Sequence, residues 1–210
     1  MTAAPGWAER RFFWVLPGVI ASGVAALVGW LLTPIWIRTL QTHPPLGLTP
    51  DLIEPVLETL RLVIEGIAIL SPVFWLLKIW GLAWLLGLVS KAMGLRTRFL
   101  ALFNLLALCS LIQTLETIAG YVIIRAEAPR MVSLDQMEPA AGFDLLLPAG
   151  TNAFLSSTLH FFSVFEIAYI AAITIGLAKL TGCSRGKAFA AVIAVWLPSL
   201  VMTWLGAAIG

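Results

Sequence analysis

Charged side chains are scarce in this sequence, which has 13 Lys and Arg and 11 Asp and Glu in 210 residues. Charged residues make up 11% and apolar residues 60% of the chain, whereas soluble domains average about 25% and about 45–50%. The formal net charge of +2 is spread thinly and forms no basic patch, which argues against nucleic-acid binding. Together with a mean hydropathy of +0.97, this composition is typical of a membrane protein.

Cysteine and histidine are also rare, with two of each. Cys109 lies in an apolar run and Cys183 in a short basic loop, so we expect two free thiols. One histidine and two carboxylates in apolar segments, without a motif such as H-E-x-x-H, are weak support for a metal site. No activated serine, cysteine or paired-aspartate motif is present, so we expect no catalytic residues, no cofactor and no metal.

Long apolar runs are abundant. A helix needs about 20 apolar residues to cross a hydrocarbon core of about 30 Å. Four runs have this length, and a fifth continues through Ser71-Pro72, where we expect a kink. The sequence predicts an all-α, polytopic membrane helix bundle of five transmembrane helices and an interfacial amphipathic helix. A cytoplasmic tail at 1–11 precedes one membrane domain at 12–210, with spans near 12–32, 70–90, 99–124, 159–180 and 188–209.

Basic residues indicate the orientation of these spans. They cluster before the first span and in two short links: Arg10, Arg11, Lys91, Arg96, Arg98, Lys179, Arg185 and Lys187. The two long links have fewer basic residues, and these are mixed with acids. The positive-inside rule therefore predicts that the amino terminus and both short links are cytoplasmic and that the carboxyl terminus is outside.

The amphipathic helix is expected at about 52–66. Glu54, Glu58, Arg61 and Glu65 follow at spacings of four, three and four, with apolar residues between them at helical period. This pattern predicts a helix in the outer interface. The same pattern would also suit a helix packed over the bundle, or an extended end of the second span.

Three ionisable residues, Lys78, Glu116 and Glu166, fall inside the expected spans. Lys78 is thirteen residues before Lys91, and Glu166 is thirteen before Lys179. Each therefore lies about 20 Å along its helix from a basic anchor. We expect these two residues to meet at one depth.

A second polar layer is expected closer to the outer surface. Glu116 follows Arg98 by eighteen residues and His160 precedes Lys179 by nineteen, which places both about 27–29 Å along their helices. Gln113 lies one turn before Glu116. The expected intramembrane polar cluster is therefore Lys78, Gln113, Glu116, His160 and Glu166.

Two interpretations of this cluster stay open. Lys78 and Glu166 could form an ion pair that ties two helices together. Alternatively, Glu116, Glu166 and His160 could line a polar cavity that moves protons or cations or holds a lipid headgroup.

Small residues recur every four positions in two spans, at Ala168, Ala172 and Gly176 and at Ala190 and Ala194. Such ladders let helices approach closely. They serve either internal packing, which we favour, or an oligomer interface.

The carboxyl-terminal half resembles the Yip domain family of multipass membrane proteins. The resemblance lies in NAFLSSTLHFFSVFEIAYIAAITIGLAKLTGCSRGKAFAAVIAVW at 152–196, and in GFDLLLP at 142–148, which is similar to the preceding link of bacterial members. In eukaryotes the family implies Golgi and endoplasmic reticulum membranes, Rab GTPase binding and vesicle traffic. Only eleven residues precede the first span here, so the chain is more similar to short bacterial members, which implies the cell inner membrane and transfers no catalytic residues.

The leading functional hypothesis is a non-enzymatic integral membrane protein that acts through helix packing with membrane partners or through lipids, as a homo-oligomer or hetero-oligomer. It could serve membrane organisation or trafficking. The alternative is a small proton, cation or lipid transporter that uses Glu116, Glu166 and His160. An intramembrane lipid-modifying enzyme is a third hypothesis, which rests only on the same groups.

Overall fold

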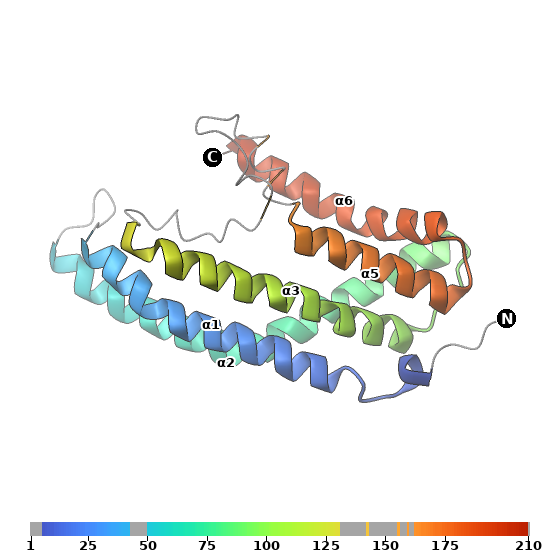
Figure 1. Ribbon diagram of the computed structural model, residues 1–210, viewed down its shortest axis with the longest axis horizontal. Helices are drawn as coiled ribbons and strands as arrows, with labels where there is room; N and C mark the ends of the chain where they lie inside the picture. The colour runs from blue at the N-terminus through green and yellow to red at the C-terminus, as the bar shows by residue number, and fades with distance from the viewer. Residues whose placement is uncertain are drawn as a thin grey trace.

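Each of the five long apolar segments forms an α-helix, and the helices lie side by side in a computed structural model of the chain (Figure 1). The structure describes residues 6–42, 50–130, 142, 155, 159 and 162–209. The elements are η1 (Gly6–Glu9), α1 (Val15–Thr42), α2 (Pro50–Ala92), α3 (Phe99–Glu127), η2 (Ala128–Arg130), α5 (Val164–Thr181) and α6 (Arg185–Ile209). Among these residues there is no strand, and the expected all-α fold is confirmed.

Four of the described helices are long and apolar enough to cross a membrane. They are Val15–Thr42, Glu54–Ala92, Phe99–Glu127 and Val164–Thr181. These four helices are consistent with a membrane protein. The fifth expected span, 188–209, forms most of α6 but is not among the four, so its crossing stays a prediction.

Successive helices alternate in direction. The turn η1, the link between α2 and α3 and the link between α5 and α6 lie at the same end of the bundle (Figure 1). The basic links can therefore share one side of a membrane, as the orientation predicted from the sequence requires. Which side is cytoplasmic stays a prediction.

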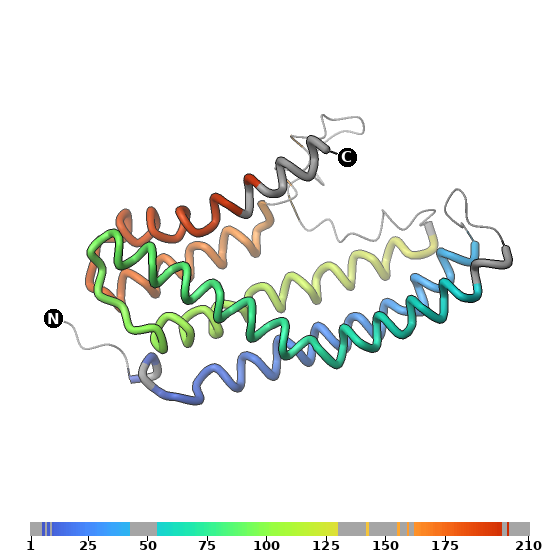
Figure 2. Tube along the Cα trace, turned by 180° about the vertical axis from the view of Figure 1, so that it is seen from behind, coloured from blue at the N-terminus to red at the C-terminus, as the bar shows by residue number. Residues whose placement is uncertain are grey.

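Helix α2 is continuous over 43 residues. Residues 52–66 form its first part, so the separate amphipathic helix expected there is absent, and the alternative of an extended second span describes the structure. The helix continues because apolar residues recur at helical spacing on both sides of Pro72. Figure 2 shows α2 changing direction about halfway along, and Pro72 is near the midpoint of its sequence, where it removes one backbone donor.

Helix α3 is the central helix of the bundle, in contact with η1, α1, α2 and α5. Small side chains on its buried faces allow this close approach: Ala101, Ala107, Cys109, Ser110, Thr114 and Gly120. The main apolar core is formed by residues of α3, α5, α6 and the second half of α2. A smaller cluster joins α1 to the far end of α3 through Val28, Leu32 and Ile124.

The segment before α1 is held against α3 by Asn104. The Asn104 Nδ2 atom donates to the carbonyl oxygens of Ala8 (3.1 Å) and Arg10 (2.9 Å). Both Asn104 and Ala8 are fully buried. The residues expected to form a tail are thus docked on the bundle from Gly6 onward.

We expect Asn104→Ala to lower the free energy of unfolding by about 1–3 kcal/mol, because two backbone carbonyls lose their donor. Thermal unfolding in detergent measures this loss. Limited proteolysis should show faster cleavage near Arg10. The control Thr59→Ala removes an exposed hydroxyl bonded within its own helix and should change stability by less than about 0.5 kcal/mol. Unchanged protease protection in Asn104→Ala would contradict the docking.

The small-residue ladders face different neighbours. A Cβ atom at Gly176 would overlap the Leu105 side chain, so α5 packs closely on α3 at this position. Ala190 and Ala194 are exposed, whereas Val192 faces the core. Gly176 thus takes part in internal packing, and the two alanines of α6 lie on its outer face.

Candidate functional site

Four of the five polar residues expected inside the spans converge where four helices meet. Lys78 comes from α2, Gln113 and Glu116 from α3, and Glu166 from the first turn of α5. The structure adds two residues that the sequence did not indicate: Ser163, which precedes α5, and Trp196 of α6. We call these six residues the polar cluster.

A chain of side-chain contacts crosses this cluster from α2 to α6. The Lys78 Nζ atom donates to Gln113 Oε1 at 3.0 Å. The Gln113 side chain in turn lies close to Glu166. The indole Nε1 of Trp196 donates to Glu166 Oε1. The contacts therefore tie four helices together through one carboxylate.

The direct ion pair between Lys78 and Glu166, one of the two interpretations from the sequence, is not present. Within the part of the chain that the structure describes, the ion pair found is Arg61 with Glu65. Gln113 lies between the two charges: its amide oxygen accepts from the ammonium, and its side chain lies close to the carboxylate. Lys78 of α2 and Glu166 of α5 are thus connected through Gln113 of α3, which lies between them.

Ser163 joins the second carboxylate to the same cluster. Its backbone is extended (φ −96°, ψ 163°), and its Oγ accepts from the Glu166 N–H at 2.9 Å, which caps α5. The hydroxyl also donates to Glu116 Oε1 of α3. This cap begins α5 at Val164, later than the 159 expected for this span.

Both carboxylates therefore lie at the amino-terminal end of α5, where the helix dipole favours negative charge. Because Ser163 contacts Glu116 and the Glu166 backbone, the two polar layers expected at different depths form one cluster. His160 and residues 143–148 of the GFDLLLP segment lie outside the described residues, so the pairing of His160 with Glu116 stays a prediction.

Trp196 and Ser163 could have been found from two signals. Ser163 and Glu166 match the S-x-x-E pattern of a helix start. Trp196 is buried, and a buried indole N–H usually finds an acceptor. The acceptor itself depends on how α6 is rotated against α5, which the sequence pattern does not specify.

Tyr169 closes the cluster on its core side. Its ring lies against that of Trp196, with centroids 5.4 Å apart, and the residue is fully buried. Its hydroxyl has no hydrogen-bond partner among the described residues. Tyr169 therefore has a buried hydroxyl donor that is unpaired among the described residues.

The side chains of the cluster can bind a proton or a cation, and they can hold helices together. It combines one ammonium, two carboxylates and several neutral donors. The described residues include no group of three or more His, Cys, Asp or Glu placed to hold a metal ion.

Comparisons of the chain with known protein families, with curated proteins and with solved structures found no match. The resemblance to the Yip domain family therefore stays a prediction from the sequence.

Proposed function

We propose that this chain is a non-enzymatic, multipass protein of a bacterial inner membrane that acts through contacts with other membrane proteins and with lipids. In this proposal the chain has five spans, a cytoplasmic amino terminus and an external carboxyl terminus. The supporting observation is the apolar outer surface of α2. Its exposed large apolar side chains are Leu62, Val63, Ile67, Ile69, Leu70, Val73, Phe74, Leu77, Trp80, Trp84, Leu85 and Leu88.

This surface is well suited to contact within a membrane. The apolar side chains continue along α2 on both sides of the bend, whereas few of its residues are buried in the bundle. Aromatic and aliphatic side chains of this kind match lipid tails and apolar helix faces equally well. The polar cluster then holds the four helices in register, with Lys78 exposed on α2, while the apolar side chains of α2 present the contact surface.

Photo-crosslinking in native membranes tests the proposal. A photoreactive residue at Trp84, which is 51% exposed, should give adducts with lipid or protein, and one at the fully buried Ala83 should give none. Native mass spectrometry of the purified chain should show bound lipid, a partner or a second copy. A strict monomer without lipid, and without adducts at Trp84, would contradict the proposal.

The polar cluster supports one alternative, a small proton or cation transporter. Its support is the linked set of contacts from Lys78 through Gln113 to Glu166, with Glu116 attached through Ser163. If this function holds, Glu166→Gln and Glu116→Gln should each reduce ion flux into liposomes, whereas the exposed Glu58→Gln should not. Equal flux in all four proteins, or no flux above protein-free liposomes, would exclude it.

A further inference from the structure

A groove runs between α1 and α2 in two connected parts. One cavity of about 380 Å³ lies toward the end of the bundle opposite η1, and another of about 330 Å³ lies next to it along the same two helices. Ala68 lines both cavities, so they meet at this residue. We call the two cavities together the α1–α2 groove.

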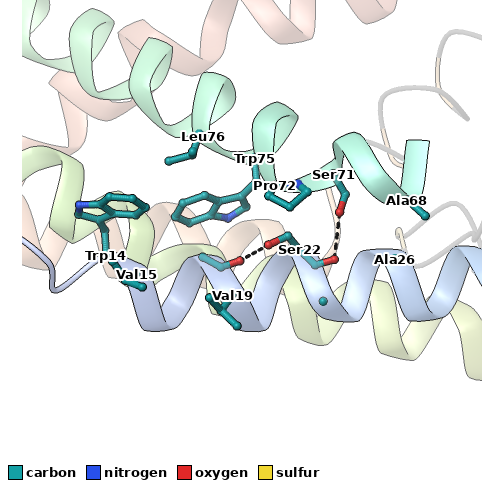
Figure 3. Close-up of a pocket in the computed structure, with 12 residues that line it drawn as sticks. Trp14, Val15, Val19, Ser22, Ala26, Ala68, Ser71, Pro72, Trp75 and Leu76 are labelled. Carbon is teal, nitrogen blue, oxygen red and sulfur yellow. Dashed lines mark hydrogen bonds between the residues drawn. The ribbon is translucent and has the colours of Figure 1, made fainter. Parts of the chain in front are cut away.

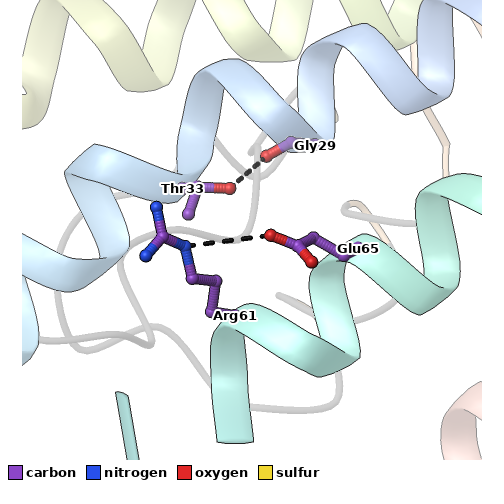
Figure 4. Close-up of polar contacts among 4 residues, drawn as sticks. All are labelled: Gly29, Thr33, Arg61 and Glu65. Carbon is purple, nitrogen blue, oxygen red and sulfur yellow. Dashed lines mark hydrogen bonds and ion pairs between the residues drawn. The ribbon is translucent and has the colours of Figure 1, made fainter. Parts of the chain in front are cut away.

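The first part of the groove is cationic. Arg61 of α2 and Arg125 of α3 both line it, together with Glu65 and Thr33. Figure 4 shows the Arg61 guanidinium extending from α2 toward Thr33 of α1. With two arginines and one carboxylate, this part has a formal charge excess of one positive unit.

Both arginines are partly held in place. The Arg61 Nε atom lies 3.8 Å from Glu65 Oε1, a contact that does not involve its two terminal nitrogens. Arg125 donates from Nη1 to the Tyr121 hydroxyl at 2.7 Å. The remaining guanidinium N–H groups are suited to the oxygens of a phosphate, which arginine binds through two parallel bonds.

The second part of the groove is apolar and lined by small residues. Figure 3 shows Ser22 and Ala26 of α1 facing Ala68 and Ser71 of α2. The Ser22 hydroxyl donates to the Gly18 carbonyl, and the Ser71 hydroxyl donates to the Ser22 carbonyl at 3.2 Å. Since these hydroxyls already donate to backbone carbonyls, the wall is suited to a hydrocarbon chain.

Two indole rings close the far end of the groove. Trp14 and Trp75 are stacked with centroids 6.5 Å apart, and Figure 3 shows them side by side at the end away from Ala68. From Arg61 to Trp75 the groove follows fourteen residues of α2, or about 21 Å, which is half of a bilayer of about 40–45 Å with its headgroup regions. The groove thus has the length of one leaflet.

We propose that the α1–α2 groove binds one anionic phospholipid, with its phosphate between Arg61 and Arg125 and an acyl chain along the small residues as far as Trp75. The inference rests on the proposed function and names its lipid class. A cationic end that continues into an apolar channel matches the two halves of such a lipid. A free phosphate would use only the first half.

Lipid retention tests both halves of the site. The protein is reconstituted in vesicles of equal phosphatidylglycerol and phosphatidylcholine, extracted, and examined by native mass spectrometry. The unchanged chain should retain phosphatidylglycerol in preference to phosphatidylcholine. Arg61→Gln with Arg125→Gln should lower this retention about tenfold, the change that corresponds to about 1.4 kcal/mol. Arg96→Gln with Lys187→Gln, which removes the same charge at the other end, should leave it unchanged.

The acyl half is tested by filling the groove. A Cβ at Gly23 would meet no atom within 4 Å, so Gly23→Leu should fold while its side chain enters the cavity that Gly23 lines. Gly81 has the same open surroundings but lies outside the residues that line the groove, and Gly81→Leu is the matched control. Thermal unfolding checks that both variants fold. Gly23→Leu alone should reduce retention of phosphatidylglycerol.

Three results would overturn the inference. The first is an equal loss of bound phosphatidylglycerol in the two double variants, and the second is unchanged phosphatidylglycerol retention in Gly23→Leu. The third is that inorganic phosphate alone displaces the lipid, with the same affinity in Gly23→Leu as in the unchanged chain. The last result would indicate a site for a free anion. If crosslinks at Trp84 persist in these cases, only the lipid site fails and the proposed function stands.

Discussion

Glu166→Leu is expected to lower the free energy of unfolding by about 1–3 kcal/mol, the range for leaving hydrogen-bonding partners unsatisfied, because Glu166 is only partly buried and Lys78 is exposed on the outer surface of the bundle. Interhelical hydrogen bonds in membranes average about 0.6 kcal/mol and reach about 1.7 kcal/mol, so losing the contacts with Trp196 and Gln113 explains only part of this effect. The rest comes from removing one of the two carboxylates near the Lys78 ammonium, which leaves Glu116 as its remaining counter-charge in the cluster. Denaturant or thermal unfolding in detergent measures the total.

A second substitution identifies the source of this loss. Lys78→Met added to Glu166→Leu should restore at least about 1 kcal/mol, because it removes an ammonium that has lost one of its two counter-charges. The exposed Glu58→Leu serves as control and should change stability by less than about 0.5 kcal/mol. If the double variant is as unstable as Glu166→Leu, the charge of Lys78 is not coupled to Glu166 through Gln113.

Gly176→Val is expected to destabilise the bundle by about 1–3 kcal/mol through overpacking. A Cβ at this position overlaps the Leu105 side chain, and valine adds two methyl groups to the α3–α5 contact. The Tm in detergent should fall accordingly. Gly81→Val is the matched control, since a Cβ there meets no atom within 4 Å.

The partner of this contact can be shortened to relieve the overlap. Leu105→Ala alone leaves a cavity and should cost about 2–5 kcal/mol, but in the Gly176→Val background its added cost should be smaller. Strictly additive losses would show that Gly176 and Leu105 do not share one packing site.

The sequence predicted the helices well because their signal is local. Runs of apolar residues and the lack of charge identify the segments that become α1, α2, α3, α5 and α6 without reference to their neighbours. Where the predicted helix boundaries differ from those of the structure, the causes are also local. Helix α2 takes in the expected separate helix at 52–66, and α5 begins at Val164 because Ser163 caps it.

The polar cluster was only partly predictable. Counting residues from the basic links indicated that Lys78 and Glu166 approach each other, because depth along a helix follows from its rise per residue. Rotation about the helix axis does not follow from depth. It decides that Gln113 lies between the two charges and that Trp196 points at Glu166, and it is set by packing among α3, α5 and α6.

The unequal lengths of the helices bear on the bilayer around the protein. Helix α5, with 18 residues, is about 27 Å long, whereas α1, with 28 residues, is about 42 Å long. The two helices lie roughly parallel (Figure 1), so tilting the whole bundle to fit α1 within a thinner bilayer would also shorten the reach of α5. Lipids beside α1 and α2 are therefore expected to be stretched relative to those beside α5. A protein of this shape would collect where membrane thickness changes.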